Sequence, residues 1–247
     1  MSFLFKHKVN WKYAIGEVIL IFLGITLAIA FDNWNESRKD EKLKQDYLLK
    51  LRSNLDQDIG DIATWIRITD LYTQEGEYLL AFLEGSAVDP DMHRLKRSLS
   101  LTQTGTPFPM NVATYNDLVS SGNMQLIKDL DFKGMLDNYY NNNAASLPIR
   151  EANRRALWYD YAPELSKYMD PLLHRTMMIE SIPWEYKGVA DLSAFWVDWK
   201  AMRGSEDLVR YLKVSLTHRI TMRINYSTDL ERAKAIRQYM DDHWDKL

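Results

Sequence analysis

The chain has no cysteine, which excludes disulfides, thiolate metal sites and cysteine nucleophiles. It also lacks a basic excess: 31 basic and 34 acidic residues give a net charge of -3. Nucleic-acid binding rests on a basic surface that releases counterions, so we expect no nucleic-acid partner. The missing cysteine leaves the redox compartment open and is compatible with a bacterial periplasm.

Residues that break regular structure are also scarce. The 247 residues include 10 glycines and 7 prolines, against 8 tryptophans and 14 tyrosines. Few breakers favour long helices, and a chain of this length can bury one good-sized core. We predict an all-α fold, in which a single N-terminal transmembrane helix continues into an elongated antiparallel helical bundle.

Familiar catalytic and metal-binding patterns are missing. The chain contains no nucleophile elbow, phosphate loop or dinucleotide fingerprint. None of the five histidines has metal-ligand spacing, and the acidic cluster around His243 has the character of a solvated terminus. We therefore expect no catalytic residue, metal or cofactor, and an enzyme only through an unrecognised site. The histidines are His7, His93, His174, His218 and His243.

One long apolar run, from Tyr13 to Phe31, organises the rest of the chain. It holds about 19 residues with a single charge, which is enough to cross a hydrocarbon core as a helix. Trp11 and Trp34 bracket it with aromatic rings of the kind that settle at the headgroup level. We predict a basic tail over 1–12, a transmembrane helix over 13–34 and an extramembrane helical domain over 35–247.

A cleavable signal peptide is the alternative to a retained anchor. Lys6 to Lys8 form a basic start, Val18 to Leu27 an apolar centre, and Ala28 to Ala30 a small-x-small cleavage pattern. Glu17 beside the apolar centre, and the polar stretch that looks like the same helix continuing, favour the anchor. A short basic tail before a long domain is typical of a signal anchor, so we expect a cytoplasmic N-terminus and a periplasmic domain.

Small residues line one side of the apolar run. At about 100° per residue, Glu17, Gly24 and Ala28 fall within about 20° of one line down the helix. Such a line lets another helix approach closely, so we predict a helix–helix seam and either self-association or another membrane protein as partner. Chance alignment is the alternative. Glu17 invites a proton-relay role, but it lies about 6 Å inside Tyr13, where it can reach the interface or pair with Lys12.

Apolar spacing and capping residues predict the helices after the anchor. A helix with an apolar face from Leu48 onward runs to Leu83 and has Gly60 as its weak point, and Asp89 caps a shorter helix that begins at Pro90. Thr114 and Asp117 resemble a capping box that opens a short helix closed by Gly122. The apolar face of the first helix comprises Leu48, Leu51, Leu55, Ile59, Ile62 and Ile66.

The second half of the chain is expected to hold two more long helices. The first spans 130–169, is broken near Pro148 or Pro163, and packs Trp158, Tyr159 and Tyr161 inward. An irregular stretch over 171–204 contains Trp184, Trp196 and Trp199, which line a groove or cap the core. Ser205 then opens a final helix. Its apolar stripe comprises Leu208, Leu212, Leu216, Ile220, Ile224, Leu230, Ile236 and Met240.

Two arginine pairs recur at a spacing of four residues. Arg150 and Arg154 lie on one predicted helix, and Arg219 and Arg223 on another. If the helices face each other, the four guanidinium groups would bind a carboxylate or phosphate. The alternative is that Glu151, Glu180, Asp229 and similar residues neutralise them in surface pairs.

Two blocks of sequence resemble an uncharacterised bacterial family of single-pass inner-membrane proteins, a domain of unknown function. One is YAIGE at Tyr13 to Glu17 with NWNE at Asn33 to Glu36; the other is TYNDLVSSGNMQLI at Thr114 to Ile127. The resemblance covers roughly the first 140 residues and implies a retained anchor in the bacterial inner membrane. It carries no catalytic residue. This chain departs from the pattern at Phe31 and Asp32, which affects only the membrane boundary.

Taken without a structure, these features favour a non-enzymatic interaction, scaffold or oligomerising protein in the lipid bilayer. An extracytoplasmic sensor that binds a small anion through the arginine pairs is the alternative. A tail of about 12 residues would leave such a sensor without an output domain of its own, so signalling would need a partner.

Overall fold

The computed structural model describes residues 11–105, 110–174 and 192–247, without the side chains of 12–14 and 149. Every named element in these ranges is helical, and the extended pairing among them is an isolated bridge between Met169 and Val197. The predicted all-α class is therefore confirmed. Lys6 to Lys8, Glu180 and Trp184, which entered the expectations above, lie outside the described residues.

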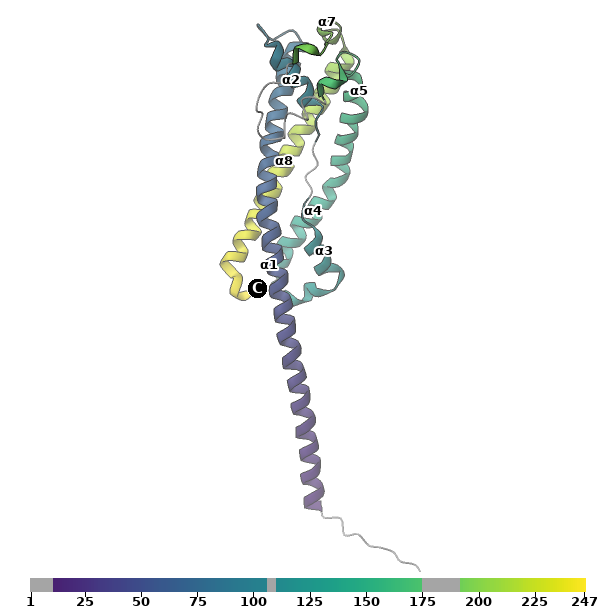
Figure 1. Cartoon of the computed structure of the whole chain (residues 1–247). Helices are drawn as coiled ribbons and strands as arrows, with labels where there is room; N and C mark the ends of the chain where they lie inside the picture. The colour runs from purple at the N-terminus through teal and green to yellow at the C-terminus, as the bar shows by residue number, and fades with distance from the viewer. Residues whose placement is uncertain (1–10, 106–109, 175–191) are drawn as a thin grey trace, which may run out of the picture.

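A single helix, α1 (Trp11–Leu83), runs the full height of the described molecule (Figure 1). Its 73 residues correspond to a rod of about 110 Å at 1.5 Å per residue. All described side chains from 15 to 43 are exposed, and this part of α1 is long and apolar enough to cross a membrane. Lys44 is the first half-buried residue. The remaining elements pack along α1 beyond that point, and we refer to residues 44–247 as the body.

The expected apolar face packs α1 into the body. Leu48, Leu51, Leu55 and Ile62 have no exposed surface. Gly60 does not interrupt the helix: it is exposed, and an added Cβ would meet nothing within 4 Å. The helix therefore continues to Leu83, and Gly85 then turns the chain with a φ of 76°.

The short helix α2 (Met92–Thr102) lies against the far end of α1. Its cap is Asp91, which accepts hydrogen bonds from the backbone of His93 and Arg94, so the predicted cap at Asp89 is wrong by two residues. Asp89 instead has a φ of 49°, the left-handed conformation that Asp tolerates better than most residues.

A second short helix, α3 (Ala113–Ser120), and the turn η1 (Asn123–Leu126) pack on α1 where it enters the body. The predicted capping box is wrong, because the N-cap is Val112 and makes no side-chain bond. Thr114 and Asp117 instead accept hydrogen bonds from Asn54 and Tyr47 of α1. Gly122 ends the helix as expected, with a φ of 75°. The hydrogen bonds of Thr114 and Asp117 therefore hold α3 against α1.

The next long helix, α4 (Leu130–Arg155), contains Pro148 without ending there. The irregularity comes later, as a π-helical turn η2 (Ala156–Tyr161), followed by α5 (Ala162–Leu165). Of the two positions predicted for the break, Pro148 is wrong, whereas the π-helical turn lies directly before Pro163 and so agrees with the other alternative. Of the three aromatic residues expected to pack inward, Tyr161 is buried, but Trp158 is 43% exposed and Tyr159 is 69% exposed.

Short elements cover the far end of the body. They comprise a helical turn over 171–174, η3 (Leu192–Ala194) and α7 (Trp199–Arg203). Trp199 packs edge-on against Phe82 of α1 at a centroid separation of 5.3 Å, as expected of a residue that caps a core. Trp196 is 53% exposed.

The last long helix, α8 (Glu206–His243), returns along α1 and ends in the turn η4 (Trp244–Lys246) (Figure 1). Ser205 caps it as predicted, accepting a hydrogen bond from the backbone of Leu208. Ile220 and Ile224, assigned to its core stripe, are instead 50% and 57% exposed. Ser215, Arg219 and Tyr226 are buried in this part of the helix.

Candidate functional site

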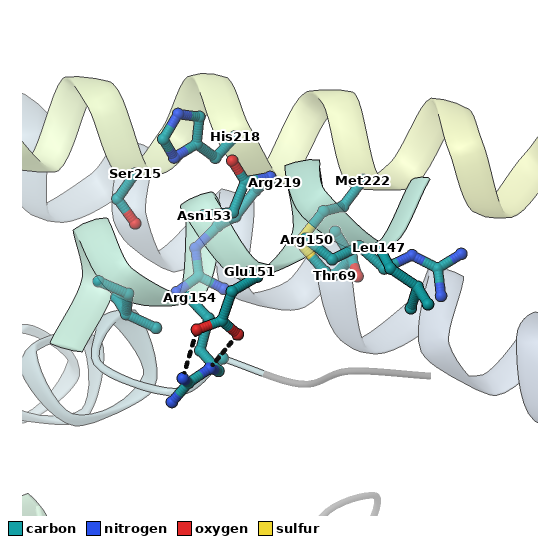
Figure 2. A pocket seen from close by; sticks show the side chains of 12 residues that line it. Thr69, Leu147, Arg150, Glu151, Asn153, Arg154, Ser215, His218, Arg219 and Met222 are labelled. Atoms are coloured by element: carbon teal, nitrogen blue, oxygen red, sulfur yellow. Dashed lines mark hydrogen bonds and ion pairs between the residues drawn. The ribbon is translucent and has the colours of Figure 1, made fainter. Parts of the chain in front are cut away.

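The candidate site is a pocket between α4 and α8, with a volume of about 280 Å³ (Figure 2). This is near the small end of the range for small-molecule sites. Thr69 of α1 and Gly105, which follows α2, complete its wall. The other lining residues are Leu147, Arg150, Glu151, Asn153, Arg154, Leu157, Ser215, His218, Arg219 and Met222.

The π-helical turn and Gly105 shape one end of the pocket. Leu157 lies in the π-helical turn, which shifts the register of the helix after α4. A Cβ added to Gly105 would lie 2.6 Å from Leu157 Cδ2, closer than carbon atoms approach, so only glycine fits there without moving Leu157. The backbone at Gly105 therefore lies directly against the side chain of Leu157 at the edge of the pocket.

Arg219 is a buried cation that lines the pocket. It is 7% exposed, and its Nη2 donates to the backbone carbonyls of Thr102 at 2.7 Å and Thr104 at 3.0 Å. Its guanidinium also lies over the ring of Tyr72, 5.3 Å from the centroid. Burial lowers the pKa of Arg219 to about 10, so the group remains charged at neutral pH.

Arg219 has no acidic neighbour among the described residues. No described carboxylate forms an ion pair with it, and its Nε forms no hydrogen bond with them. Burying a cation without a counter-charge costs several kcal/mol, because water solvated that charge in the unfolded chain. Asn153 resembles Arg219 in one respect: its buried Nδ2 also forms no hydrogen bond with the described residues.

The other predicted arginines each meet a carboxylate. Arg150 Nη2 lies 3.5 Å from Asp229, and both side chains are buried. Burial raises the pKa of Asp229, and the guanidinium of Arg150 opposes that rise. Arg154 donates twice to Glu151, at 2.6 and 2.7 Å, and this exposed pair is drawn with dashed lines in Figure 2. Arg223 lies outside the pocket and pairs with Asp70 at 2.6 Å.

The structure thus brings Arg150, Arg154 and Arg219 to one pocket and directs Arg223 to α1. The predicted surface pairing describes Arg154 and Arg223, whereas Arg150 forms a buried pair. Asn153 was missed, because an asparagine in a helix has no distinctive spacing. The neighbouring Arg150 and Arg154 mark that helix in the sequence, but do not reveal which face is buried.

Catalytic geometry is not evident in the pocket. Ser215 and His218 both line it, without a hydrogen bond between them. Burial lowers the pKa of His218 below its usual value, which leaves the imidazole neutral near pH 7. Within the described part of the chain, no group of three His, Asp or Glu residues is arranged to hold a metal ion.

The predicted seam lies on the exposed part of α1. Glu17 and Ala28 are exposed, and a Cβ added to Gly24 would meet nothing within 4 Å. The side chain of Lys12, a proposed partner of Glu17, lies outside the described residues.

Comparison with known proteins adds no relative. A scan against family models, a search of curated proteins and a search of solved structures each returned no match.

Proposed function

We propose that this chain is a membrane-anchored binding protein whose antiparallel helical bundle holds a small organic anion in the pocket between α4 and α8. One observation carries the proposal: Arg219 is a buried cation that lines the pocket, and no described carboxylate pairs with it. A bound anion would supply the missing counter-charge. Arg219 loses solvation free energy when the chain folds, and binding of the anion would recover part of it.

The anchor and its location belong to the same proposal. The exposed apolar part of α1 supports a span over 13–34. We propose that the bundle lies on the periplasmic side of a bacterial inner membrane, because Lys8 and Lys12 come just before the span. N-terminal sequencing of the mature protein tests the retained anchor. A chain that begins at Phe31 would mean that the segment is a cleaved signal peptide.

The test of binding is ligand-induced stabilisation of the full chain in mild detergent. Small organic anions are added one at a time during thermal unfolding, and those that stabilise the chain are titrated by calorimetry. An anion present at 100 times its Kd should stabilise the folded state by about 2.7 kcal/mol. Arg219→Met should abolish that stabilisation. Arg219→Lys keeps the charge but loses the planar donor arrangement, so it should retain weakened binding.

Arg223→Met is the matched control, because Arg223 lies one turn further along α8, outside the pocket. It should bind the anion as the wild type does. Equal stabilisation of the wild type and Arg219→Met would contradict the proposal, as would an absence of stabilisation by every anion tested. Arg219→Lys guards against the case in which Arg219→Met fails to fold.

Self-association through α1 is the second candidate function, that of a non-enzymatic scaffold. The observation that favours it is the exposed line of Glu17, Gly24 and Ala28, where nothing lies within 4 Å of a Cβ built on Gly24. Gly24→Leu should weaken association in an energy-transfer assay in membranes by about 1 kcal/mol, because the added side chain separates the two backbones. Leu23→Ile, on another face, should have little effect. Equal association of Gly24→Leu and the wild type would exclude the seam.

A further inference from the structure

The charges around the pocket are mostly compensated already. Glu151 binds Arg154 through two hydrogen bonds, and Asp229 lies against Arg150. Asp229 also lies 3.5 Å from Arg232. Arg219 is therefore the guanidinium in the lining that lacks a described carboxylate partner. The pocket consequently offers about one uncompensated positive charge.

Additional negative charge in the pocket would be repelled. Glu151 lines the pocket directly, and Asp229 lies behind Arg150. Two like charges about 4 Å apart repel by about 4 kcal/mol at the effective dielectric constant of a protein surface. These carboxylates would repel the second negative charge of a dianion. The described lining holds no second arginine without a carboxylate partner that could offset this repulsion.

The donors and the walls define the rest of the ligand. Arg219 and Asn153 line the pocket, and Arg219 Nε and Asn153 Nδ2 are two buried donors, each without a hydrogen bond to the described residues. Once these side chains turn towards the cavity, the two oxygens of a carboxylate can accept from them. Leu147, Leu157 and Met222 form an apolar wall of the same pocket, and Figure 2 shows Leu147 and Met222 among the lining side chains. An apolar body attached to the carboxylate would cover this wall and gain free energy from its removal from water.

We propose that the pocket selects a monoanionic carboxylate with an apolar body, such as a small aromatic or short aliphatic acid, and discriminates against dianions. This inference rests on the proposed function and specifies the ligand class of the same site. Arg219 and Asn153 bind the carboxylate, the apolar wall binds the body, and Glu151 rejects a second charge.

The experiment is calorimetric titration of the full chain in mild detergent with benzoate, succinate and inorganic phosphate at pH 7. Benzoate carries one charge on an apolar ring, succinate carries two charges, and phosphate lacks an apolar body. We expect the wild type to bind benzoate at least tenfold more tightly than either of the others. Asn153→Leu should weaken benzoate binding, because it removes one of the two donors.

Glu151→Gln is the sharpest variant. Glu151 is exposed, so the change should not affect folding, and it releases Arg154 as a second cation beside the pocket. Succinate binding should improve about tenfold, with a smaller change for benzoate. Glu231→Gln is the matched control, because Glu231 forms the same kind of i,i+3 pair, with Lys234, outside the pocket. It should change neither affinity.

The apolar wall has its own matched pair of variants. Leu147 lines the pocket and is 55% exposed, whereas Ile224 is 57% exposed and does not line it. Leu147→Ala should weaken benzoate binding about fivefold, and Ile224→Ala should not. Equal effects of the two variants would overturn the role of the apolar body.

The outcomes separate this inference from the proposed function. If succinate or phosphate binds as tightly as benzoate and still depends on Arg219, the anion-binding function stands and the monoanion inference falls. If none of the three anions binds, the proposed function falls together with the inference. Tight benzoate binding that Glu151→Gln extends to succinate supports both.

Discussion

Buried ionisable residues in this protein fall into two kinds. Asp58 has no exposed surface, but accepts hydrogen bonds from the backbone and side chain of Asn111 and from the hydroxyl of Tyr139. Glu75 is likewise bound by Arg94, Arg97 and Ser98 of α2. These two carboxylates join α1 to neighbouring segments and are satisfied. Arg219, which lacks a described counter-charge, is of the second kind, and for that reason points to a ligand.

Asp58 should give the stability of the fold a characteristic pH dependence. Burial raises its pKa above the ordinary value of 3.8, against the opposing effect of its hydrogen bonds. The folded chain therefore binds this proton more readily than the unfolded chain, and the Asp58 contribution to stability increases as the pH falls through the folded-state pKa towards 3.8. Urea unfolding between pH 7 and pH 4 measures it. The free energy of unfolding of the wild type should rise relative to that of Asp58→Asn across this range; a constant difference would contradict the assignment.

Capping residues were the least predictable feature at this scale. Asp89 and Asp91 both precede the same short helix, and local sequence does not say which of them adopts the cap conformation. Thr114 and Asp117 have capping-box spacing, yet they bond to Asn54 and Tyr47. Contacts between distant parts of the chain outcompeted a local bond in that case.

Among the elements, the apolar periodicity of α1 predicted its buried face, whereas that of α8 failed halfway. Residues spaced by four advance about 40° around a helix at each step. From Leu208 to Ile224 four such steps add up to about 160°, which turns Ile224 to the opposite side of α8. Leu208, Leu212 and Leu216 are buried, and Ile220 and Ile224 are exposed. The inward face in that region carries polar Ser215 and Arg219, so hydrophobicity alone could not identify the pocket wall.

Two glycines of α1 should respond differently to the same substitution. Gly60→Ala should raise the free energy of unfolding by about 0.5–1 kcal/mol, because Ala is the better helix former and the added Cβ meets nothing. Gly76→Ala should give no gain, because its Cβ would lie 2.6 Å from Cδ2 of buried Leu216. Thermal unfolding of both variants measures the difference. A stability gain at Gly76 equal to that at Gly60 would mean that α1 and α8 are less closely packed than described.

For the whole molecule, the body should fold without the apolar segment of α1. Residues 15–38 expose every described side chain, so their removal deletes no buried contact. A chain that begins at Lys39 should be soluble without detergent, show a helical circular dichroism spectrum, and retain the melting temperature of the full chain. Substantial strand content, or loss of cooperative unfolding, would contradict the fold.

The continuity of α1 also fixes how the proposed seam faces relative to the body. At about 100° per residue, Glu17, Gly24 and Ala28 lie about 170° around the helix from the buried leucines at 48, 51 and 55. Small residues Ser53, Gly60 and Thr64 continue the seam line beside the body, where Ser53 and Gly60 are exposed. Two copies paired along that line would stand back to back, with their bodies on opposite outer sides and clear of each other. One residue inserted between Trp34 and Tyr47 would rotate each body by about 100° about the axis of its own α1 and bring it round towards its partner.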